Sequence, residues 1–192
     1  MKRLKFVPLG LTILLLAACS DSMAQNPAPA QMTVMVGGQA MFPAKDIVDN
    51  AVNSADHTTL VAAVKAAGLV ATLKSAGPFT VFAPVNAAFD ALPPGTVATL
   101  LKPENKATLT KVLTYHVVPG RLDFDALHKM VMDGNGTASL TTVAGAKLMV
   151  KMNGPHNILV IDAKGDVAHI TTYDVYQSNG VIQVIDKVML PG

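Results

Sequence analysis

The hydrophobic pattern of this chain changes once, near residue 135, and this change restricts the possible folds more than any other feature. Residues 45–132 carry apolar side chains at helical spacing, in short stretches separated by glycine and proline. Residues 137–190 instead form short β-rich runs separated by turn signals such as Asn179-Gly180. Because the helices precede the strands and do not alternate with them, the pattern predicts an α+β domain rather than a series of β-α-β units.

The N-terminus has the pattern of a signal peptide for export. The basic residues Lys2, Arg3 and Lys5 precede an apolar run over residues 6–16. This run is too short for a comfortable membrane span, which needs roughly 20 residues. We therefore assign residues 1–18 to a bacterial signal peptide.

Two processing sites follow the apolar run. The segment Leu16 to Cys19 resembles the bacterial lipobox, whose cysteine is lipidated and becomes the new N-terminus. The alternative is ordinary cleavage after Ala24, which would secrete the protein. We favour lipidation of Cys19 because its match is complete and lies where the apolar run ends. Ser20 follows the cysteine, and by resemblance to enterobacterial sorting this favours a lipid-anchored protein of the outer membrane or periplasm.

Cys19 is the only cysteine, so no intramolecular disulfide can form and the fold depends on its hydrophobic core. Residues 19–39 are rich in alanine, proline and methionine and are interpreted as a flexible tether. Residues 40–192 then form one domain, which is long enough to build a core.

The charge of the exported part argues against nucleic acid as a partner. The formal net charge is +2, but three of the 15 Lys and Arg residues lie in the signal peptide, which leaves 12 against 13 Asp and Glu. No stretch of the sequence has a basic face, so the electrostatic basis for nucleic-acid binding is missing.

Three stretches of the chain resemble the fasciclin-domain family, and in particular its small single-domain bacterial secreted and lipoprotein members. The stretches are Gly77–Phe89, Leu113–Gly120 and Asn179–Val188, and the resemblance covers residues 41–191. Val85 departs from the family, in which threonine is common at that position. The resemblance implies a fasciclin-like β-wedge or roll flanked by several short helices, mostly in the N-terminal half. It also implies a non-enzymatic module of cell adhesion or of envelope and extracellular interaction.

The residues of the first stretch have a structural interpretation. Phe82 and Phe89 are expected in the core. Pro84 and Asn86 are expected to form a corner between a strand and a helix, with the Asn86 side chain accepting backbone N–H groups.

Tyr115 and His116 are the candidate partner-binding residues. If this segment is extended, their side chains point to opposite sides, one toward the core and the other toward the surface. The resemblance supports a role in binding, since the Tyr-His motif is linked to receptor binding in animal members. The alternative is that His116 is buried and hydrogen-bonded and fixes the sheet.

No catalytic motif is found in the sequence. Neither a Gly-x-Ser-x-Gly nucleophile elbow nor a His-Glu-x-x-His zinc site is present. We therefore expect no enzyme, no cofactor and no metal, and a macromolecular partner that is either a protein or a polysaccharide. An unidentified small-ligand-binding envelope protein is kept as an alternative.

Methionine suggests one further alternative, a periplasmic Met/His copper-binding protein. The chain has ten methionines and five histidines, and thioethers are suitable ligands for Cu(I). The pairs are Met32 with Met35 and Met149 with Met152. The second pair has odd spacing on an expected strand, so its side chains should face opposite sides, which suits packing better than metal binding.

Overall fold

The computed structural model describes residues 33–192. The signal peptide, Cys19, Ala24, Met32 and most of the expected tether lie outside these residues. Within residues 33–192, no helix has both the length and the apolar character needed to cross a membrane.

The described chain alternates short helices with single strands before it continues into a run of strands. The first half contains β1 (Val34–Val36), β2 (Gln39–Met41), α1 (Ile47–Ala51), η1 (Ala55–His57), α2 (Thr58–Ala67), α3 (Val70–Leu73), β3 (Phe79–Pro84), α4 (Asn86–Asp90), α5 (Thr96–Leu100), η2 (Pro103–Asn105), α6 (Lys106–Tyr115) and β4 (Val117–Pro119). The second half contains α7 (Phe124–Asp133), β5 (Thr137–Thr141), β6 (Lys147–Met152), β7 (Ile158–Ile161), β8 (Val167–Gln177) and β9 (Gly180–Ile185).

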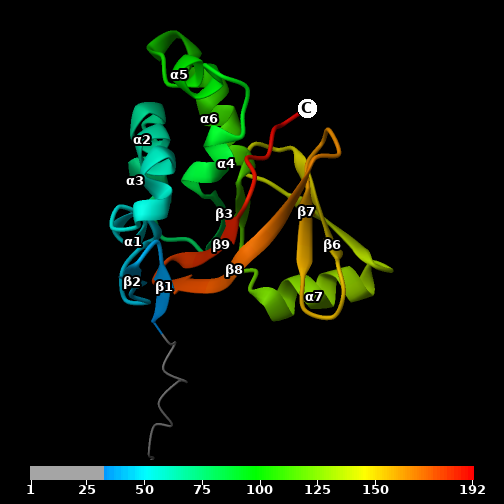
Figure 1. Ribbon diagram of the computed structural model, residues 1–192. Helices are drawn as coiled ribbons and strands as arrows, with labels where there is room; N and C mark the ends of the chain where they lie inside the picture. The colour runs from blue at the N-terminus through cyan, green and yellow to red at the C-terminus, as the bar shows by residue number, and fades with distance from the viewer. Residues whose placement is uncertain (1–32) are drawn as a thin grey trace, which may run out of the picture. The chain divides into compact units, whose positions relative to one another are not determined.

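A seven-stranded sheet with the order β4-β3-β9-β8-β7-β6-β5 forms the centre of the domain (Figure 1). All neighbouring strands pair antiparallel except β3 and β9, which run parallel with Phe79 opposite Gly180. The two ends of the sheet approach each other, because the N–H of Val143, just after β5, donates to the Val117 carbonyl of β4 at 2.8 Å. The sheet is therefore a nearly closed roll, and the expected α+β fold of fasciclin type is confirmed.

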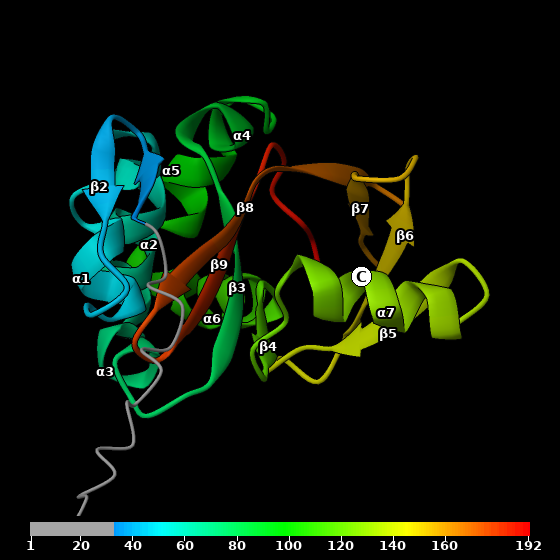
Figure 2. The same ribbon diagram turned by 90° about the horizontal axis from the view of Figure 1, so that it is seen from below.

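Strand β3 separates two hydrophobic cores, because successive side chains of a strand point to opposite faces. Val81 and Ala83 belong to the core shared with the N-terminal helices, whereas Phe82 belongs to the core inside the roll. Figure 2 shows α7 lying along β5 and β6. Leu127 and Val131 of α7 are fully buried in the second core.

The domain begins earlier than the expected boundary at residue 40. Strands β1 and β2 form a hairpin whose Val36 and Met41 are buried in the first core. Its turn residues Gly37 and Gly38 have φ angles of 58° and 73°, which glycine adopts without steric cost and which a two-residue hairpin turn requires. The alanine- and proline-rich composition of residues 19–39 placed the start of the domain too late in the sequence. The last residues assigned to the tether are part of the fold.

Candidate functional site

The Tyr115-His116 segment lies inside the domain and is not extended. Tyr115 is the last residue of α6, and its side chain is 0% exposed. The Tyr115 hydroxyl donates to the Lys147 carbonyl at 2.8 Å and accepts from the Ala163 N–H at 3.0 Å. The expectation that one side chain of this pair faces the surface is wrong, because helical backbone continues through Tyr115 and both side chains are buried.

His116 fixes two segments that are far apart in the chain. Nδ1 donates to the Val112 carbonyl at 2.8 Å, and Nε2 accepts from the Met189 N–H at 3.0 Å. The ring is therefore neutral with its proton on Nδ1. Burial lowers the pKa of His116 to about 4, although the Val112 carbonyl opposes this shift. These contacts agree with the alternative in which His116 is a buried structural residue.

The residues of the first sequence stretch occupy the expected corner between β3 and α4. Phe82 and Phe89 are buried in the core, as expected, and Pro84 ends the strand. Asn86, in contrast, does not cap its own helix. Its Oδ1 accepts from the Thr59 N–H at 3.0 Å, and its Nδ2 donates to the Ala55 carbonyl at 2.8 Å. Asn86 thus caps the start of α2 from another part of the chain.

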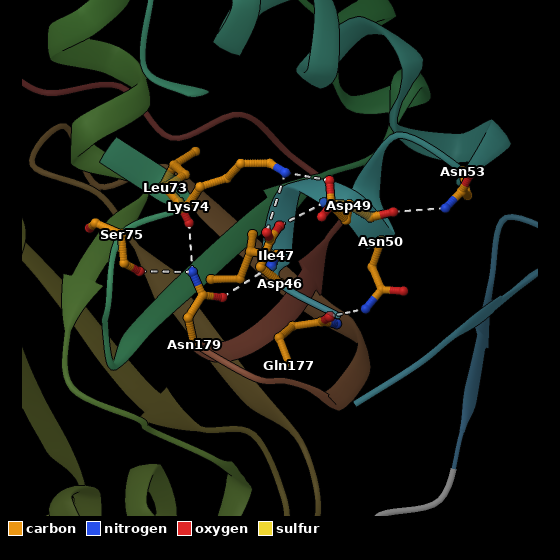
Figure 3. Close-up of polar contacts among 10 residues, drawn as sticks. All are labelled: Asp46, Ile47, Asp49, Asn50, Asn53, Leu73, Lys74, Ser75, Gln177 and Asn179. Atoms are coloured by element: carbon orange, nitrogen blue, oxygen red, sulfur yellow. Dashed lines mark hydrogen bonds and ion pairs between the residues drawn. The ribbon is translucent and has the colours of Figure 1, made fainter. Parts of the chain in front are cut away.

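Asn179 plays a similar part at the turn between β8 and β9, where sequence analysis indicated only a turn. Figure 3 shows its side chain between α1 and the end of α3. Oδ1 accepts from the Ile47 N–H at 3.1 Å, and Nδ2 donates to the carbonyls of Leu73 at 2.7 Å and Ser75 at 3.1 Å. Nearby, Lys74 pairs with Asp49 at 2.6 Å, which lowers the pKa of that carboxyl.

The outer face of strands β5 to β8 is the candidate interaction surface. Leu148 and Val150 of β6 point into the core, so Met149 between them points outward and is 44% exposed. The strand register places Met149 directly opposite Ser139 of β5 and Ile161 of β7, and Ile161 opposite Val167 of β8. Ile161 and Val167 are half-buried, so an apolar row crosses three strands on a face open to solvent.

Basic residues flank this apolar row. Lys147 and Lys151 are exposed on either side of Met149 along β6, and the ion pairs of the described residues include neither of them. His169 of β8 lies opposite Leu159, and its Nδ1 is 3.0 Å from Asp186 Oδ2. We call the outward residues of β5 to β8 around Met149 the outer face.

Met149 and Met152, one of the two pairs considered for the copper alternative, face opposite sides of β6, as the odd spacing predicted. Met149 points outward, whereas Met152 packs against the second core. Met35 is exposed on β1. Between residues 33 and 192, no group of three or more His, Cys, Asp or Glu side chains is placed to hold a metal ion.

A comparison with known protein families tests whether the chain is related to the family that its three sequence stretches resemble. Residues 55–191 match the sequence profile described as Fasciclin domain, and they include the Asn86 corner, the Tyr115-His116 segment and the Asn179 turn. The chain belongs to the fasciclin-domain family. In this fasciclin domain, the side chains of Asn86, His116 and Asn179 each bond to a segment distant in the chain. A local sequence pattern does not reveal such contacts.

Relatives of this fasciclin domain are found among bacterial proteins. Protein sll1483 of Synechocystis sp. is 44% identical over 161 residues, which cover 84% of this chain and 82% of that protein. The cell surface glycolipoprotein MPB83 of Mycobacterium bovis is 33% identical over 181 residues, which cover 90% of this chain and 70% of that protein.

A solved structure shares the fold. It is a FAS1 domain pair from the insect cell adhesion molecule fasciclin I, with a TM-score of 0.69 and 17% sequence identity. The match covers 77% of this chain and 51% of that chain. At this identity the likeness establishes the fold of the domain.

Proposed function

We propose that this protein is a non-enzymatic binding module of the cell envelope that recognises a protein partner through its outer face. The observation that carries the proposal is the apolar row of Met149, Ile161 and Val167, flanked by Lys147 and Lys151. An apolar centre with a charged rim is the usual composition of a protein interface. Sheet faces exposed to solvent are otherwise polar, so apolar side chains aligned across three strands require a reason.

The charge of the outer face indicates what the partner carries. Lys147 and Lys151 each lie two residues from Met149 along the same strand face, and no acidic side chain of β5, β6 or β7 accompanies them. The carboxylate beside β8, Asp186, is paired with His169. A partner with an apolar centre and acidic residues around it would therefore complement this surface. A polysaccharide would use the lysines but would leave the apolar row without a matching surface.

The relatives support a location outside the cytoplasm. One is a cell surface glycolipoprotein, and a protein of the same fold is a cell adhesion molecule. The predicted signal peptide and Cys19 agree with these descriptions, and we propose that lipid on Cys19 anchors the chain to the outer membrane. Several acyl chains on one cysteine would hold it firmly, since each buried methylene contributes about 0.8 kcal/mol.

The outer face is tested by cross-linking from the full chain in its own envelope. A photoreactive residue replaces Ser139, which is exposed directly opposite Met149. We expect a covalent adduct with a protein at this position and none when the same residue replaces Glu104, in η2. Substitution Met149→Glu in the full chain should then weaken binding of the identified protein at least about tenfold, as loss of a central interface residue does.

Met132→Glu is the matched control, because Met132 is 52% exposed on α7 and lies away from the outer face. It should bind the partner like the unmodified chain. Equal binding by the Met149 and Met132 variants, or adducts that contain only polysaccharide, would contradict the proposal for the outer face.

The anchor is tested separately. Cys19→Ala should move the protein from the membrane fraction to the soluble fraction. Unchanged membrane partition, or a mature N-terminus at Gln25 in the unmodified protein, would exclude the lipid and favour the secreted alternative.

A further inference from the structure

A cavity of about 80 Å³ lies in the first core, between helices α1 to α3 and strands β3 and β9. Its wall consists almost entirely of aliphatic side chains, among them Ile47, Leu60, Val64 and Val184. Two lining residues, Lys65 of α2 and Val143 after β5, are exposed, so the cavity reaches the surface beside them. It is separate from the outer face, whose side chains do not line it.

One polar atom in this wall has no partner. Among the buried side-chain atoms of residues 33–192, only His57 Nε2 makes no hydrogen bond, although His57 is 3% exposed. The other nitrogen, Nδ1, lies 2.8 Å from Ser54 Oγ. A buried polar group without a partner costs free energy, so an unpaired ring nitrogen in the wall of a cavity is a feature to be explained.

The hydroxyl of Ser54 determines whether His57 Nε2 is a hydrogen-bond donor or an acceptor. When the Ser54 O–H donates to Nδ1, the ring proton is on Nε2, and Nε2–H is a donor. Burial lowers the pKa of His57, so the neutral ring is favoured at neutral pH. The Ala83 carbonyl and the Asp56 carboxylate oppose this shift, but the Ala83 oxygen does not meet hydrogen-bond geometry with Nε2, which stays without a partner.

We propose that this cavity binds a small apolar molecule, or the end of a longer apolar chain, that carries one oxygen accepting a hydrogen bond from His57 Nε2. A single donor in an apolar wall is the common design of small-molecule sites, in which a few polar groups fix the orientation. Water is a poor occupant by comparison, because a buried water needs two to four polar partners, about three on average. Of the other polar side chains of the wall, Lys65 and Thr72 belong to exposed residues. Thr114 Oγ1 donates to the Thr110 carbonyl, and both ring nitrogens of His116 are bonded.

The volume limits the size of the bound part. An engineered apolar cavity of roughly 150 Å³ binds benzene, which has six heavy atoms, so a cavity about half as large accommodates about three heavy atoms. Butanone, with five heavy atoms, is mainly apolar and carries one acceptor oxygen, and its atoms beyond this number extend toward the opening beside Lys65. The alkene in which a CH₂ group replaces the ketone oxygen has the same shape and no acceptor. The pair therefore separates filling of the cavity from the hydrogen bond.

The experiment is a titration of the full chain with each probe, followed by NMR of the histidine ring nitrogens and the core methyl groups. The chain carries Cys19→Ala so that no acyl chain competes for the cavity. We expect both probes to shift the methyl resonances of Leu60, Val64 and Val184, and butanone to bind about fivefold to tenfold more tightly, as one hydrogen bond provides. Only butanone should shift the ring nitrogens of His57.

Variants of the wall and of a remote histidine complete the test. His57→Leu should reduce the affinity for butanone to that for the alkene, and Val64→Ile should weaken both probes because it fills the cavity. His156→Leu, at an exposed position, should change neither affinity. Ser54→Ala gives a second measurement should His57→Leu not fold, since it frees Nδ1 and should diminish the preference for butanone.

Three results would overturn the proposal. They are the absence of core methyl shifts with both probes near saturation, equal affinities for butanone and the alkene in the unmodified wall, and an undiminished preference for butanone in the folded His57→Leu or Ser54→Ala variant. None of these results bears on partner binding by the outer face, so the two proposals fail independently.

Discussion

His116 Nε2 accepts the backbone N–H of Met189 at 3.0 Å, across 73 residues of chain. This bond attaches the final segment of the domain to the end of α6, and the Met189 side chain is fully buried beside it. The bond needs a neutral ring, because a protonated imidazole has no acceptor nitrogen. Protonation of His116 therefore breaks the hydrogen bond that attaches the C-terminal segment to the end of α6.

The free energy of unfolding is expected to fall as the pH is lowered from about 6.5 to about 4. The pKa of His116 is near 6.5 in the unfolded chain and is lowered by burial to about 4 in the folded domain. Between these values the unfolded state binds more protons, so stability rises with pH and is complete above about 6.5. The contribution is about 3 kcal/mol, since one pKa unit corresponds to about 1.4 kcal/mol.

Urea unfolding at pH 7.5, 5.5 and 4.5 measures this dependence. The control is His116→Gln, which cannot titrate. It should be less stable at pH 7.5 and should show a flatter pH profile, with the remaining slope in the same direction from His57, whose pKa is also lowered. The same slope in this variant and the unmodified domain would show that other groups cause the dependence.

Tyr115→Phe is expected to destabilise the domain by about 2 kcal/mol without affecting partner binding. The substitution removes two hydrogen bonds of a fully buried side chain, which its hydroxyl makes with the Lys147 carbonyl and the Ala163 N–H. Tyr176→Phe is the matched control, because its half-buried hydroxyl makes one longer bond, 3.3 Å to Asp123 Oδ2. That variant should lose about 0.5 kcal/mol. Lower partner affinity of a stably folded Tyr115→Phe protein would restore a recognition role for this residue.

Asn86→Ala is expected to cost about 2–3 kcal/mol, measured by thermal or urea unfolding. The side chain supplies the cap at the start of α2 and a second bond to the Ala55 carbonyl, and both are lost together. Asn105→Ala is a suitable comparison because Asn105 makes one exposed bond to the Thr99 carbonyl. The two variants should differ by about 2 kcal/mol, and equal losses would mean that the connection to α2 contributes little.

Gly180→Ala is expected to destabilise the domain by about 3 kcal/mol or more. A Cβ at Gly180 would lie 2.2 Å from the Phe79 carbonyl oxygen, so β3 and β9 would have to separate where they pair in parallel. Gly154→Ala controls for the substitution itself. A Cβ at Gly154 would meet no atom within 4 Å. The only cost to the free energy of folding is the φ of 79°, which is unfavourable for alanine by about 1–2 kcal/mol. Comparable unfolding free energies of the two variants would contradict the close approach of the strands.

The elements predicted well from the sequence are those whose signal is local. Strands β6 and β7 lie within residues 137–190, where β-rich runs were expected, because alternation of apolar residues depends only on neighbouring positions. Asp123 begins α7 by a similarly local contact, because its carboxylate accepts from the Ala126 N–H at 2.9 Å, three residues along the chain. Both kinds of signal lie within a few residues of the element that they specify.

The candidate site was predicted less well, because its residues act over long separations. Tyr115 and His116 were expected to point to opposite sides only if their segment is extended, and this condition is not met because α6 continues through Tyr115. The outer face was not found, since Met149, Ile161 and Val167 form a row only through strand register. A search for apolar residues at both outward and inward positions of the predicted strands could have indicated it.

By itself, the sequence determined the class of the fold, the concentration of short helices in the N-terminal half, the reliance on a core without disulfides and the family to which the domain belongs. These follow from composition and from periodicities that extend over a few residues. Tertiary structure decided which helix Asn86 caps and that Tyr115 and His116 are buried. It also decided that an apolar row exists and that a cavity has His57 Nε2 without a partner in its wall. Such features depend on pairs of residues tens of positions apart, and only the packed chain fixes which of those residues meet.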